Sequence, residues 1–252
     1  MIFSTWDIIL ERKTMKINKS IIVFAPHPDD EVIACGGTII KKIQEGYDVN
    51  IVFMTDGSHS HSAVLNIFTN PTPNELKKIR KEEAINASKV LGVSKEKISF
   101  IDAEDTLLKE SINMASDKIE NILKIINNLE QIYLPHQEEL HQDHSLTNVI
   151  VTNVLKKLSL NIEVFKYIVW DEETEKEFNF SLRGTVNKSI EQTKRKEKQI
   201  VIDISDVLEQ KIRALKEHKS QIELISLSQT KPVLPILMFE RLRNKKYEEF
   251  YI

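Results

Sequence analysis

The chain has 252 residues, of which 41% are hydrophobic and 29% are charged, so it is long enough to bury a core without a disulfide or a structural metal. Its formal net charge of −3 excludes the strongly basic composition that is typical of nucleic-acid-binding proteins. The single cysteine excludes an internal disulfide framework and favours a reducing compartment, so a cytoplasmic location is expected. No apolar run approaches the ~18 residues that a membrane-spanning helix requires.

Short apolar runs alternate with amphipathic stretches along most of the chain. The apolar runs predict strands over residues 20–25, 48–55, 97–103, 131–135, 162–170 and 200–204. The stretches between them have helical periodicity and cover residues 31–47, 74–91, 111–128, 143–158 and 206–219. This alternation is typical of an α/β fold with a mainly parallel sheet flanked by helices.

One domain is expected over residues 20–252, because the chain contains no internal repeat and no low-complexity linker. Residues 1–19 are expected to be a short N-terminal extension, with Met15 as an alternative start. They do not resemble a signal peptide, since Asp7 interrupts their apolar part. The charged residues 171–198 predict an insertion at the rim of the site, and residues 56–73 predict a polar loop over it.

Two clusters of histidines and carboxylates follow two of the predicted strands. The first is HPDDE at 27–31, directly after the first strand, and the second is HQDH at 141–144, shortly after the fourth. In open parallel sheets, ligands bind beyond the carboxyl ends of the strands, where the strand order reverses. In a 3-2-1-4-5 order the first and fourth strands are neighbours, so both clusters are expected to face one crevice.

These side chains suit a catalytic zinc ion, which takes three ligands from His, Asp, Glu or Cys and leaves one position for water. His27 and Asp30 are three residues apart around a tight turn, so both can point at one ion. Either His141 or His144 supplies the third ligand, and the other is then free to polarise a carbonyl or protonate a leaving amine. Asp29 lies between the ligands of the first cluster, where it can take a proton from water.

Each cluster also has a simpler interpretation when it is taken alone. The carboxylates of Asp29 and Asp30 suit the capping of exposed amides at a helix start. His141 and His144 suit the exposed face of a polar helix. A metal site explains both clusters together, and the sequence therefore predicts one.

The same residues resemble the signature of the PIG-L or LmbE-like zinc-dependent N-acetylglucosaminyl deacetylases, which is AHPDDE followed by HxDH. The chain has APHPDDE at 25–31, with an additional proline before the histidine, and HQDH at 141–144. Further similarities lie at 36–38 (GGT), 80–92 (R-x-x-E followed by A and LG) and 211–221 (K, AL and H-x-SQ). The resemblance covers most of residues 20–252 and implies a Rossmann-like, LmbE-like sandwich.

The resemblance assigns a role to each residue of the predicted metal site. It implies that His27, Asp30 and His144 bind one zinc ion per chain and that Asp29 is the general base. The choice of His144 over His141 as the third ligand follows from the family alone. Fe²⁺ or another divalent ion is the alternative to zinc, because a His/His/Asp site accepts several first-row metals.

The remaining candidates concern the oxyanion and the substrate. By the same resemblance, His141 stabilises the tetrahedral oxyanion or protonates the amine, and Asp143 tunes it. Arg80 is a candidate for substrate binding, because a guanidinium grips sugar hydroxyls or a phosphate, and its alternative is a surface position on a helix. Asp102 ends the third strand and is a candidate partner for a sugar hydroxyl, with capping of the next loop as its alternative.

The activity that the resemblance implies is removal of the acetyl group from an N-acetylated sugar of the N-acetylglucosamine type, with release of acetate. The expected partner is therefore a small amino-sugar conjugate, and neither nucleic acid nor a membrane is expected. One alternative is hydrolysis of another small acyl amide by the same residues. Another is a metal- or sugar-binding module without turnover. The sequence leaves the oligomeric state open, and the family's habit of forming homo-oligomers makes a homo-oligomer one candidate.

Overall fold

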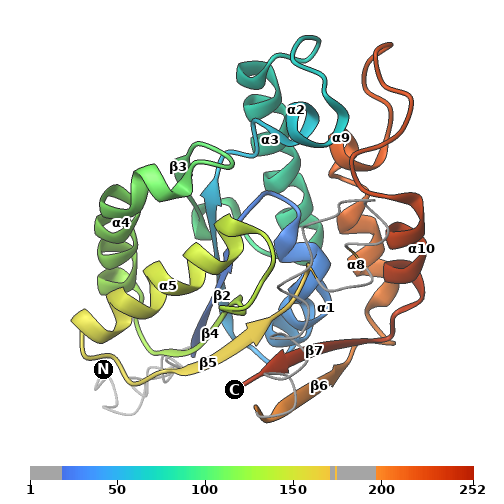
Figure 1. The fold of residues 1–252 in the computed structure, drawn as a ribbon. Helices are drawn as coiled ribbons and strands as arrows, with labels where there is room; N and C mark the ends of the chain where they lie inside the picture. The colour runs from blue at the N-terminus through green and yellow to red at the C-terminus, as the bar shows by residue number, and fades with distance from the viewer. Residues whose placement is uncertain (1–18, 171–173, 175–196) are drawn as a thin grey trace, which may run out of the picture.

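The computed structural model describes residues 19–170, 174 and 197–252 (Figure 1). The expected N-terminal extension and the expected insertion over 171–198 lie almost wholly outside these residues. Within them, one sheet runs through the molecule and helices pack on both of its faces. The α/β fold that the sequence predicts is confirmed.

The described residues form a seven-stranded sheet in the order β3-β2-β1-β4-β5-β7-β6. The pairs from β3 to β5 are parallel, whereas β7 is antiparallel to both β5 and β6. The order of the first five strands is therefore the expected one, with β1 beside β4. The strands are β1 (Ser20–Ala25), β2 (Asp48–Thr55), β3 (Ile98–Ala103), β4 (Leu129–Pro135), β5 (Glu163–Tyr167), β6 (Gln199–Asp203) and β7 (Tyr247–Tyr251).

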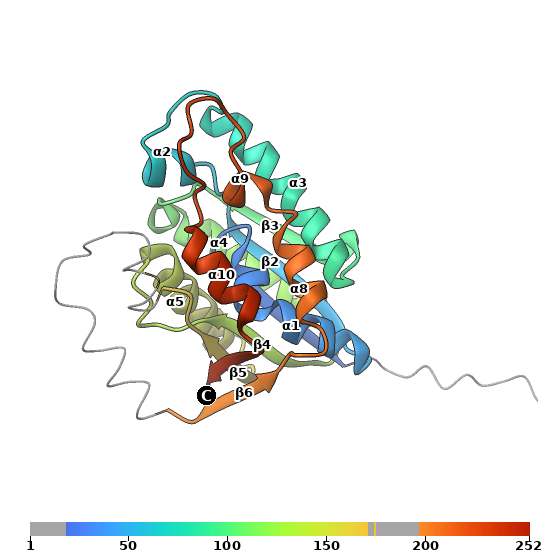
Figure 2. The same cartoon turned by 90° about the vertical axis from the view of Figure 1, so that its right-hand side faces the viewer.

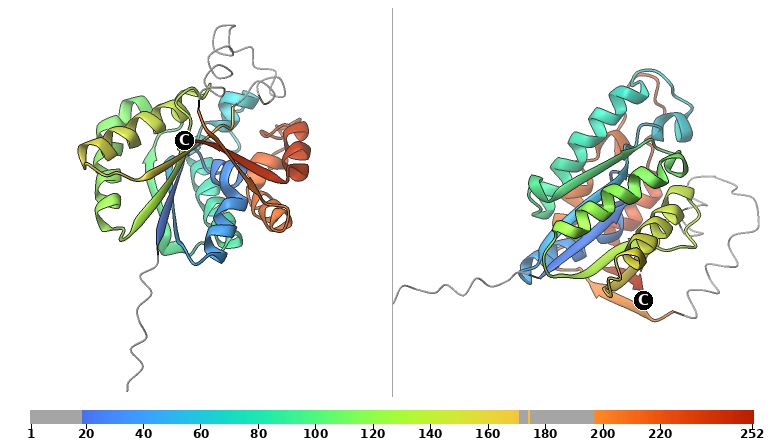
Figure 3. Two further views of the ribbon diagram at one scale, coloured as in Figure 1. Left: turned by 90° about the horizontal axis from the view of Figure 1, so that it is seen from below. Right: turned by 90° about the vertical axis from the view of Figure 1, so that its left-hand side faces the viewer.

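The helices form two layers (Figure 3). One layer contains α1 (Asp30–Gln44), α3 (Pro73–Leu91), α8 (Leu208–Leu215) and α10 (Ile236–Asn244), and the other contains α4 (Ile112–Ile125) and α5 (Gln142–Lys157). Shorter segments are α2 (Ser60–Leu65), η1 (Lys95–Lys97), η2 (Leu108–Ser111) and α9 (Lys219–Ile222). No helix in the described parts of the chain is long and apolar enough to cross a membrane.

The central strand β1 shows why the sheet is buried on both faces. All six residues of SIIVFA are buried, because a helix layer covers each side. Side chains alternate along a strand, so Ile21 and Val23 enter the core beneath α1 and α3. Ile22 and Phe24 enter the separate core beneath α4 and α5. The carboxyl end of this strand is therefore held firmly where it meets the first polar cluster.

The C-terminal part of the chain differs from the sequence-based expectation. The sequence analysis predicts no element after residue 219, but the structure has the helix α10 and the strand β7 there. The pattern YEEFY concealed this strand, because Glu248 is only 3% exposed. The segment 56–73, expected to be a loop, contains α2. Charge on a buried residue and a helix of six residues are both weak signals in a single sequence.

Candidate metal centre and active site

The first polar cluster forms a tight turn between β1 and α1. The backbone N–H of His27 donates to Asp30 Oδ2 (2.9 Å), and that of Asp29 donates to Glu31 Oε2 (2.9 Å). Asp29 has φ 140°, in the region that favours glycine. Two buried carboxylates therefore hold the turn in a conformation that costs a non-glycine residue free energy.

Three potential ligand atoms converge beside this turn. His27 Nδ1 lies 3.2 Å from Asp30 Oδ2, and His144 Nε2 lies 3.1 Å from the same oxygen. The two nitrogens are 3.3 Å apart. Ligands at about 2.0–2.1 Å from a tetrahedral ion lie about 3.4 Å from one another. His27, Asp30 and His144 therefore have the chemistry and the spacing of a zinc site.

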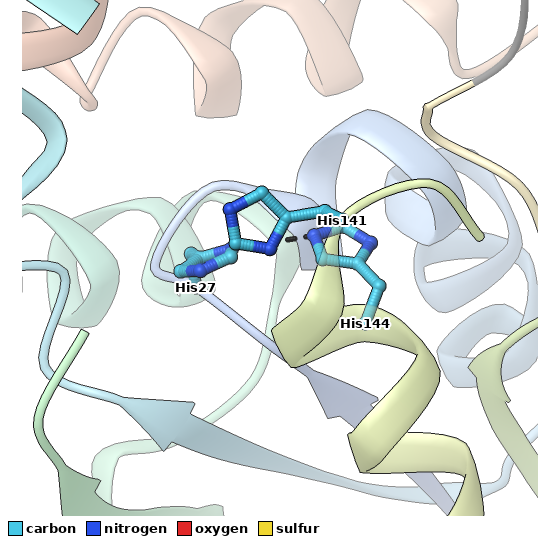
Figure 4. Close-up of side chains that lie close together, drawn as sticks. All are labelled: His27, His141 and His144. Atoms are coloured by element: carbon cyan, nitrogen blue, oxygen red, sulfur yellow. Dashed lines mark hydrogen bonds between the residues drawn. The ribbon is translucent and has the colours of Figure 1, made fainter. Parts of the chain in front are cut away.

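Two wider groupings of potential ligands also include His27. One combines it with His141 and His144, and the other with Asp105 and Asp143, in each case within 4.8 Å. Figure 4 shows the three histidine rings gathered at the start of α5 and the turn after β1. The set with Asp30 is the tightest, because its atoms all lie within 3.3 Å of each other.

In His27 and His144, the ring nitrogen that is not in the triangle with Asp30 lies close to a carboxylate. His27 Nε2 lies 3.3 Å from Asp105 Oδ1 and 3.4 Å from Asp143 Oδ2. His144 Nδ1 lies 3.3 Å from Glu139 Oε1, and Glu139 also accepts the backbone N–H groups that follow β5. Such partners orient metal-binding histidines and raise their basicity.

Asp105 was not among the residues singled out from the sequence. It lies two residues beyond the end of β3, at the same edge of the sheet as the other clusters. Its position just after a strand end was the signal that could have identified it. The sequence analysis chose Asp102, at the end of the same strand, instead. Asp102 lies near Lys81 (3.4 Å) and Lys77 (4.0 Å) and is not among the residues that line the cavity described below.

Burial and charge act in opposite directions on the proposed ligands. Burial alone lowers the pKa of His144, but the carboxylates of Asp30 and Glu139 outweigh it and raise the pKa to about 9. Burial alone raises the pKa of Asp30, but His144 and His27 outweigh it and hold the pKa well below its usual range. Each group thus favours the charged form of the other, and the cluster favours a cation at its centre.

Asp29 is held by an arginine from α3. Its Oδ2 lies 3.1 Å from Nη2 of Arg80, and the same guanidinium donates to the carbonyl oxygens of Pro28 (2.5 Å) and Gly57 (3.1 Å). Burial raises the pKa of Asp29 to about 6, against the opposing effect of Arg80. Arg80 is 2% exposed, which excludes the surface position that was its alternative, and its contacts orient the turn. Its candidate role in substrate binding stays a prediction.

His141 is the N-cap residue of α5. Its ring Nδ1 accepts the backbone N–H of Asp143 at 3.3 Å, which leaves Nε2 as the N–H side of a neutral ring. Burial, followed by the nearby His27 and His144, lowers the pKa of His141 to about 3. The Asp143 carboxylate faces His27, so its contact with His141 in this structure is through the backbone.

His59 and His61, the histidines of the segment 56–73, do not lie together as a further group of potential metal ligands. His59 Nε2 lies 3.0 Å from Glu104 Oε1, whereas the buried His61 donates from Nε2 to the Ser220 carbonyl oxygen at 3.0 Å. They therefore contact different elements, and His61 joins α2 to α9.

A cavity of about 400 Å³ opens beside these groups. His27, Asp29, Asp30 and His141 line one part of it, together with Arg80. A carboxylate, a neutral imidazole and two potential metal ligands thus line one cavity at the carboxyl ends of β1 and β4. This arrangement can activate a water molecule and polarise a carbonyl group that enters the cavity.

The sequence model of the PIG-L family, described as GlcNAc-PI de-N-acetylase, matches residues 22–155. The chain belongs to the PIG-L family. It is accordingly a deacetylase, and the family and enzyme class expected from the sequence are confirmed. The matched residues of this PIG-L protein include both polar clusters and Arg80.

Proteins similar to this PIG-L deacetylase differ in their substrates. The probable N-acetyl-α-D-glucosaminyl L-malate deacetylase 2 of Bacillus cereus is 27% identical over 208 residues, which cover 82% of this chain and 86% of that protein. The diacetylchitobiose deacetylase of Thermococcus kodakarensis is 28% identical over 222 residues, which cover 84% and 76%. The structure of a deacetylase of teicoplanin biosynthesis has a TM-score of 0.66 at 15% identity, covering 92% of this chain and 97% of that one, and shows the fold alone.

Proposed function

We propose that this PIG-L deacetylase removes the acetyl group from an N-acetylated amino-sugar conjugate, with one zinc ion held by His27, Asp30 and His144. The observation that carries the proposal is the tight triangle of their donor atoms beside Asp29 and His141. The sugar class is supported by the names of the relatives from B. cereus and T. kodakarensis, which act on N-acetylated glucosamine compounds.

The proposed reaction needs a base at the metal centre. Zinc in such a site lowers the pKa of water to about 7 and polarises carbonyl groups. Asp29 accepts the proton of the attacking water on its carboxylate, which Arg80 holds in place at 3.1 Å. The strained backbone of Asp29 keeps that carboxylate on the cavity side of the turn.

His141 acts on the other side of the amide. Its neutral ring donates a hydrogen bond from Nε2 to the carbonyl oxygen as negative charge develops there, where such donors have the greatest effect. A C–O bond forms to the acetyl carbon and the C–N bond breaks. The proton taken up by Asp29 passes to the leaving nitrogen, which leaves as a free amine. The acetic acid formed releases the second proton of the water to solvent and leaves as acetate.

The first experiment measures metal content and acetate release on one preparation of the full chain. Purification without oxygen, followed by metal analysis, distinguishes zinc from Fe²⁺. Acetate release from N-acetylglucosamine conjugates, with about one metal ion per chain, supports the proposal. Turnover of other acyl amides but not of these conjugates would transfer the function to a related amidohydrolase.

The Asp29→Asn variant distinguishes a catalyst from a binding module. We expect kcat to fall by about 10²–10⁴-fold, because a positioned base contributes that much, while metal content stays unchanged. Asp117→Asn, on the exposed face of α4, is the matched control and should keep full activity. Unchanged hydrolysis by Asp29→Asn would contradict the assigned base. The cytoplasmic location stays a prediction from the sequence, and a homo-oligomer stays one candidate for the oligomeric state.

A further inference from the structure

The cavity beside the metal centre has two unlike ends. The histidines and carboxylates described above form one end. Residues from α2 and from the segment 233–238, whose last three residues begin α10, line a further part of the cavity, called here the apolar end. Ser60, Ala63 and Val64 line it from α2 with the spacing i, i+3, i+4, so one face of this short helix forms a wall.

The wall that the segment 233–238 contributes is apolar. Val233, Leu234 and Met238 line the cavity there, and their exposed fractions are only 7%, 5% and 2%. They belong to the run VLPILMF at 233–239, to which the metal chemistry gives no role. The packed side chains therefore present a defined apolar surface next to the catalytic groups.

Hydrogen bonds anchor both walls to α9. The backbone N–H of Leu234 donates to the carbonyl oxygen of Gln221 at 2.7 Å, and His61 of α2 donates to that of Ser220 at 3.0 Å. Figure 2 shows α2, α9 and the chain entering α10 along the same side of the molecule. The walls are consequently preformed, which lowers the entropy lost on ligand binding.

The charged groups of the cavity already have partners near the metal end. Arg80 is bound to Asp29 and to two backbone carbonyls. Asp105 faces His27 and accepts the backbone N–H of His59 at 2.9 Å.

Two polar side chains also line the cavity near α2 and α9: Ser60, whose Oγ is buried without a hydrogen-bond partner among the described residues, and Gln221, whose side-chain amide donates to Ser220 Oγ at 2.7 Å. A second sugar ring would lose water from several hydroxyls and find only these two groups beside the apolar residues, which is unfavourable.

We propose that the apolar end of the cavity binds an apolar aglycone, an alkyl or aryl group on the anomeric carbon of the N-acetylated sugar. The inference rests on the proposed function, in which the acetamido group occupies the metal end. The cavity of about 400 Å³ lies within the range of small-molecule sites. Burial of the aglycone against Val64, Leu234 and Met238 supplies binding free energy that hydroxyl groups cannot obtain there.

The test uses β-glycosides of N-acetylglucosamine with methyl, butyl, hexyl and octyl aglycones, and diacetylchitobiose as the polar counterpart. Acetate release gives kcat/KM for each substrate on the zinc-loaded full chain. Calorimetry gives the affinity of the matching glucosamine glycosides, the products, and does not depend on turnover. We expect affinity and kcat/KM to rise about fourfold for each methylene that is buried, and diacetylchitobiose to fall below the hexyl glycoside.

A pair of leucines in the same run provides a matched control. Leu234→Ser places a hydroxyl in the wall and should reduce the dependence on chain length to less than about twofold per methylene, because part of the apolar contact is lost. Leu237 is 69% exposed and is not a lining residue, so Leu237→Ser should keep the full dependence. Since Leu234 is buried, Val64→Ser on the half-buried face of α2 is the second variant if Leu234→Ser does not fold.

The two measurements keep the inference separate from the proposed function. Affinity that rises with aglycone length, without acetate release, would support the apolar site and overturn the acetyl reaction. Acetate release with affinities that do not depend on aglycone length would overturn the apolar site alone. A gain that follows the length of the N-acyl chain in N-acyl methyl glycosides, and not the aglycone, would also overturn it.

Discussion

Two clusters of buried charged side chains contact α1. They differ in how fully other groups of the protein neutralise their charge. The cluster at the start of the helix contains four carboxylates with exposed fractions of 4% or less around two imidazoles, from Asp30, Asp105, Glu139, Asp143, His27 and His144. One oxygen of Asp143 has no hydrogen-bond partner among the described residues. Negative charge in this cluster therefore exceeds what the two histidines balance.

The other cluster, around Lys211 and Glu248, lies farther along α1, and its two charges pair with each other. Lys211 Nζ lies 2.7 Å from Glu248 Oε1 and donates to the Ile33 carbonyl oxygen at 2.9 Å. Glu248 also accepts the backbone N–H groups of Gly37 and Thr38, both at 2.8 Å, and the Thr38 hydroxyl at 2.6 Å. One positive charge meets one negative charge, and protein donors satisfy the carboxylate.

The comparison distinguishes a structural ion pair from a functional site. A buried charge is tolerated when it is paired and hydrogen-bonded within the protein, as for Lys211 and Glu248. The cluster at the start of α1 lacks that balance, and a divalent cation supplies it. The excess of buried carboxylates is thus evidence for a metal ion that is independent of the sequence signature.

The largest expected effect comes from removing a ligand. In the wild type, metal at about 1,000 times its Kd should raise the free energy of unfolding by about 4 kcal/mol. His144→Ala should lose most of this gain and lower metal affinity by more than the ~10–100-fold typical of residues behind the ligands. Thermal unfolding with and without zinc measures the gain in stability, and its dependence on zinc concentration measures the metal affinity. His59→Ala, outside the cluster, should respond as the wild type does, and an unchanged response in His144→Ala would exclude it as a ligand.

The second prediction breaks the balanced cluster. Lys211→Met leaves the Glu248 carboxylate buried without its cation, which should lower the free energy of unfolding by about 3–5 kcal/mol. Metal content per folded chain should not change. The double variant Lys211→Met/Glu248→Gln removes both charges and should recover part of the loss, as urea unfolding would show. Equal stability of the single variant and the wild type would contradict the structural role of the pair.

The smallest effects come from two glycines that differ in their surroundings. Gly46 has φ +88°, and a Cβ there would have no neighbour within 4 Å among the described residues, so Gly46→Ala should cost only the backbone strain, about 1–2 kcal/mol. Gly57 has φ +65°, and a Cβ there would lie 2.6 Å from Arg80 Nη1. Gly57→Ala should have the same strain and also displace the guanidinium from Asp29.

Kinetics separate these two variants. Displacement of Asp29 by Gly57→Ala should lower kcat by about 10–100-fold, since small misplacements of catalytic groups have effects of this order. Gly46→Ala should keep the wild-type kcat, and both should retain the metal. A normal kcat for Gly57→Ala would show that Arg80 does not orient the base.

The central part of the fold was predictable because its signals are local. Strands β1 and β2 begin and end where the apolar runs do, and the expected order of the first five strands follows from parallel pairing around a reversal. The strand β7 was missed because one of its buried residues is Glu248, whose partner Lys211 lies 37 residues away. A single sequence does not show that such a charge is neutralised.

The candidate site likewise has features that the sequence predicted and features that it did not. Positions after strand ends, together with ligand chemistry, were enough to bring HPDDE and HQDH together. They did not show that Asp105 backs His27, that Asp102 lies outside the cavity, or that Arg80 holds Asp29. Those facts depend on side-chain directions at the ends of β1 and β3 and on α3, which no periodicity encodes.

The sequence by itself determined the residue types of the proposed metal centre and the edge of the sheet on which they lie. The tertiary structure decided which atoms meet: His27 Nδ1 and His144 Nε2, 117 residues apart, lie at 3.3 Å. It also brought α2 and the segment 233–238 to the same cavity as His27, Asp29 and Asp30. The physical reason is that the positions of strands and helices follow from local hydrophobic pattern, whereas contacts between distant side chains follow from how the whole core packs.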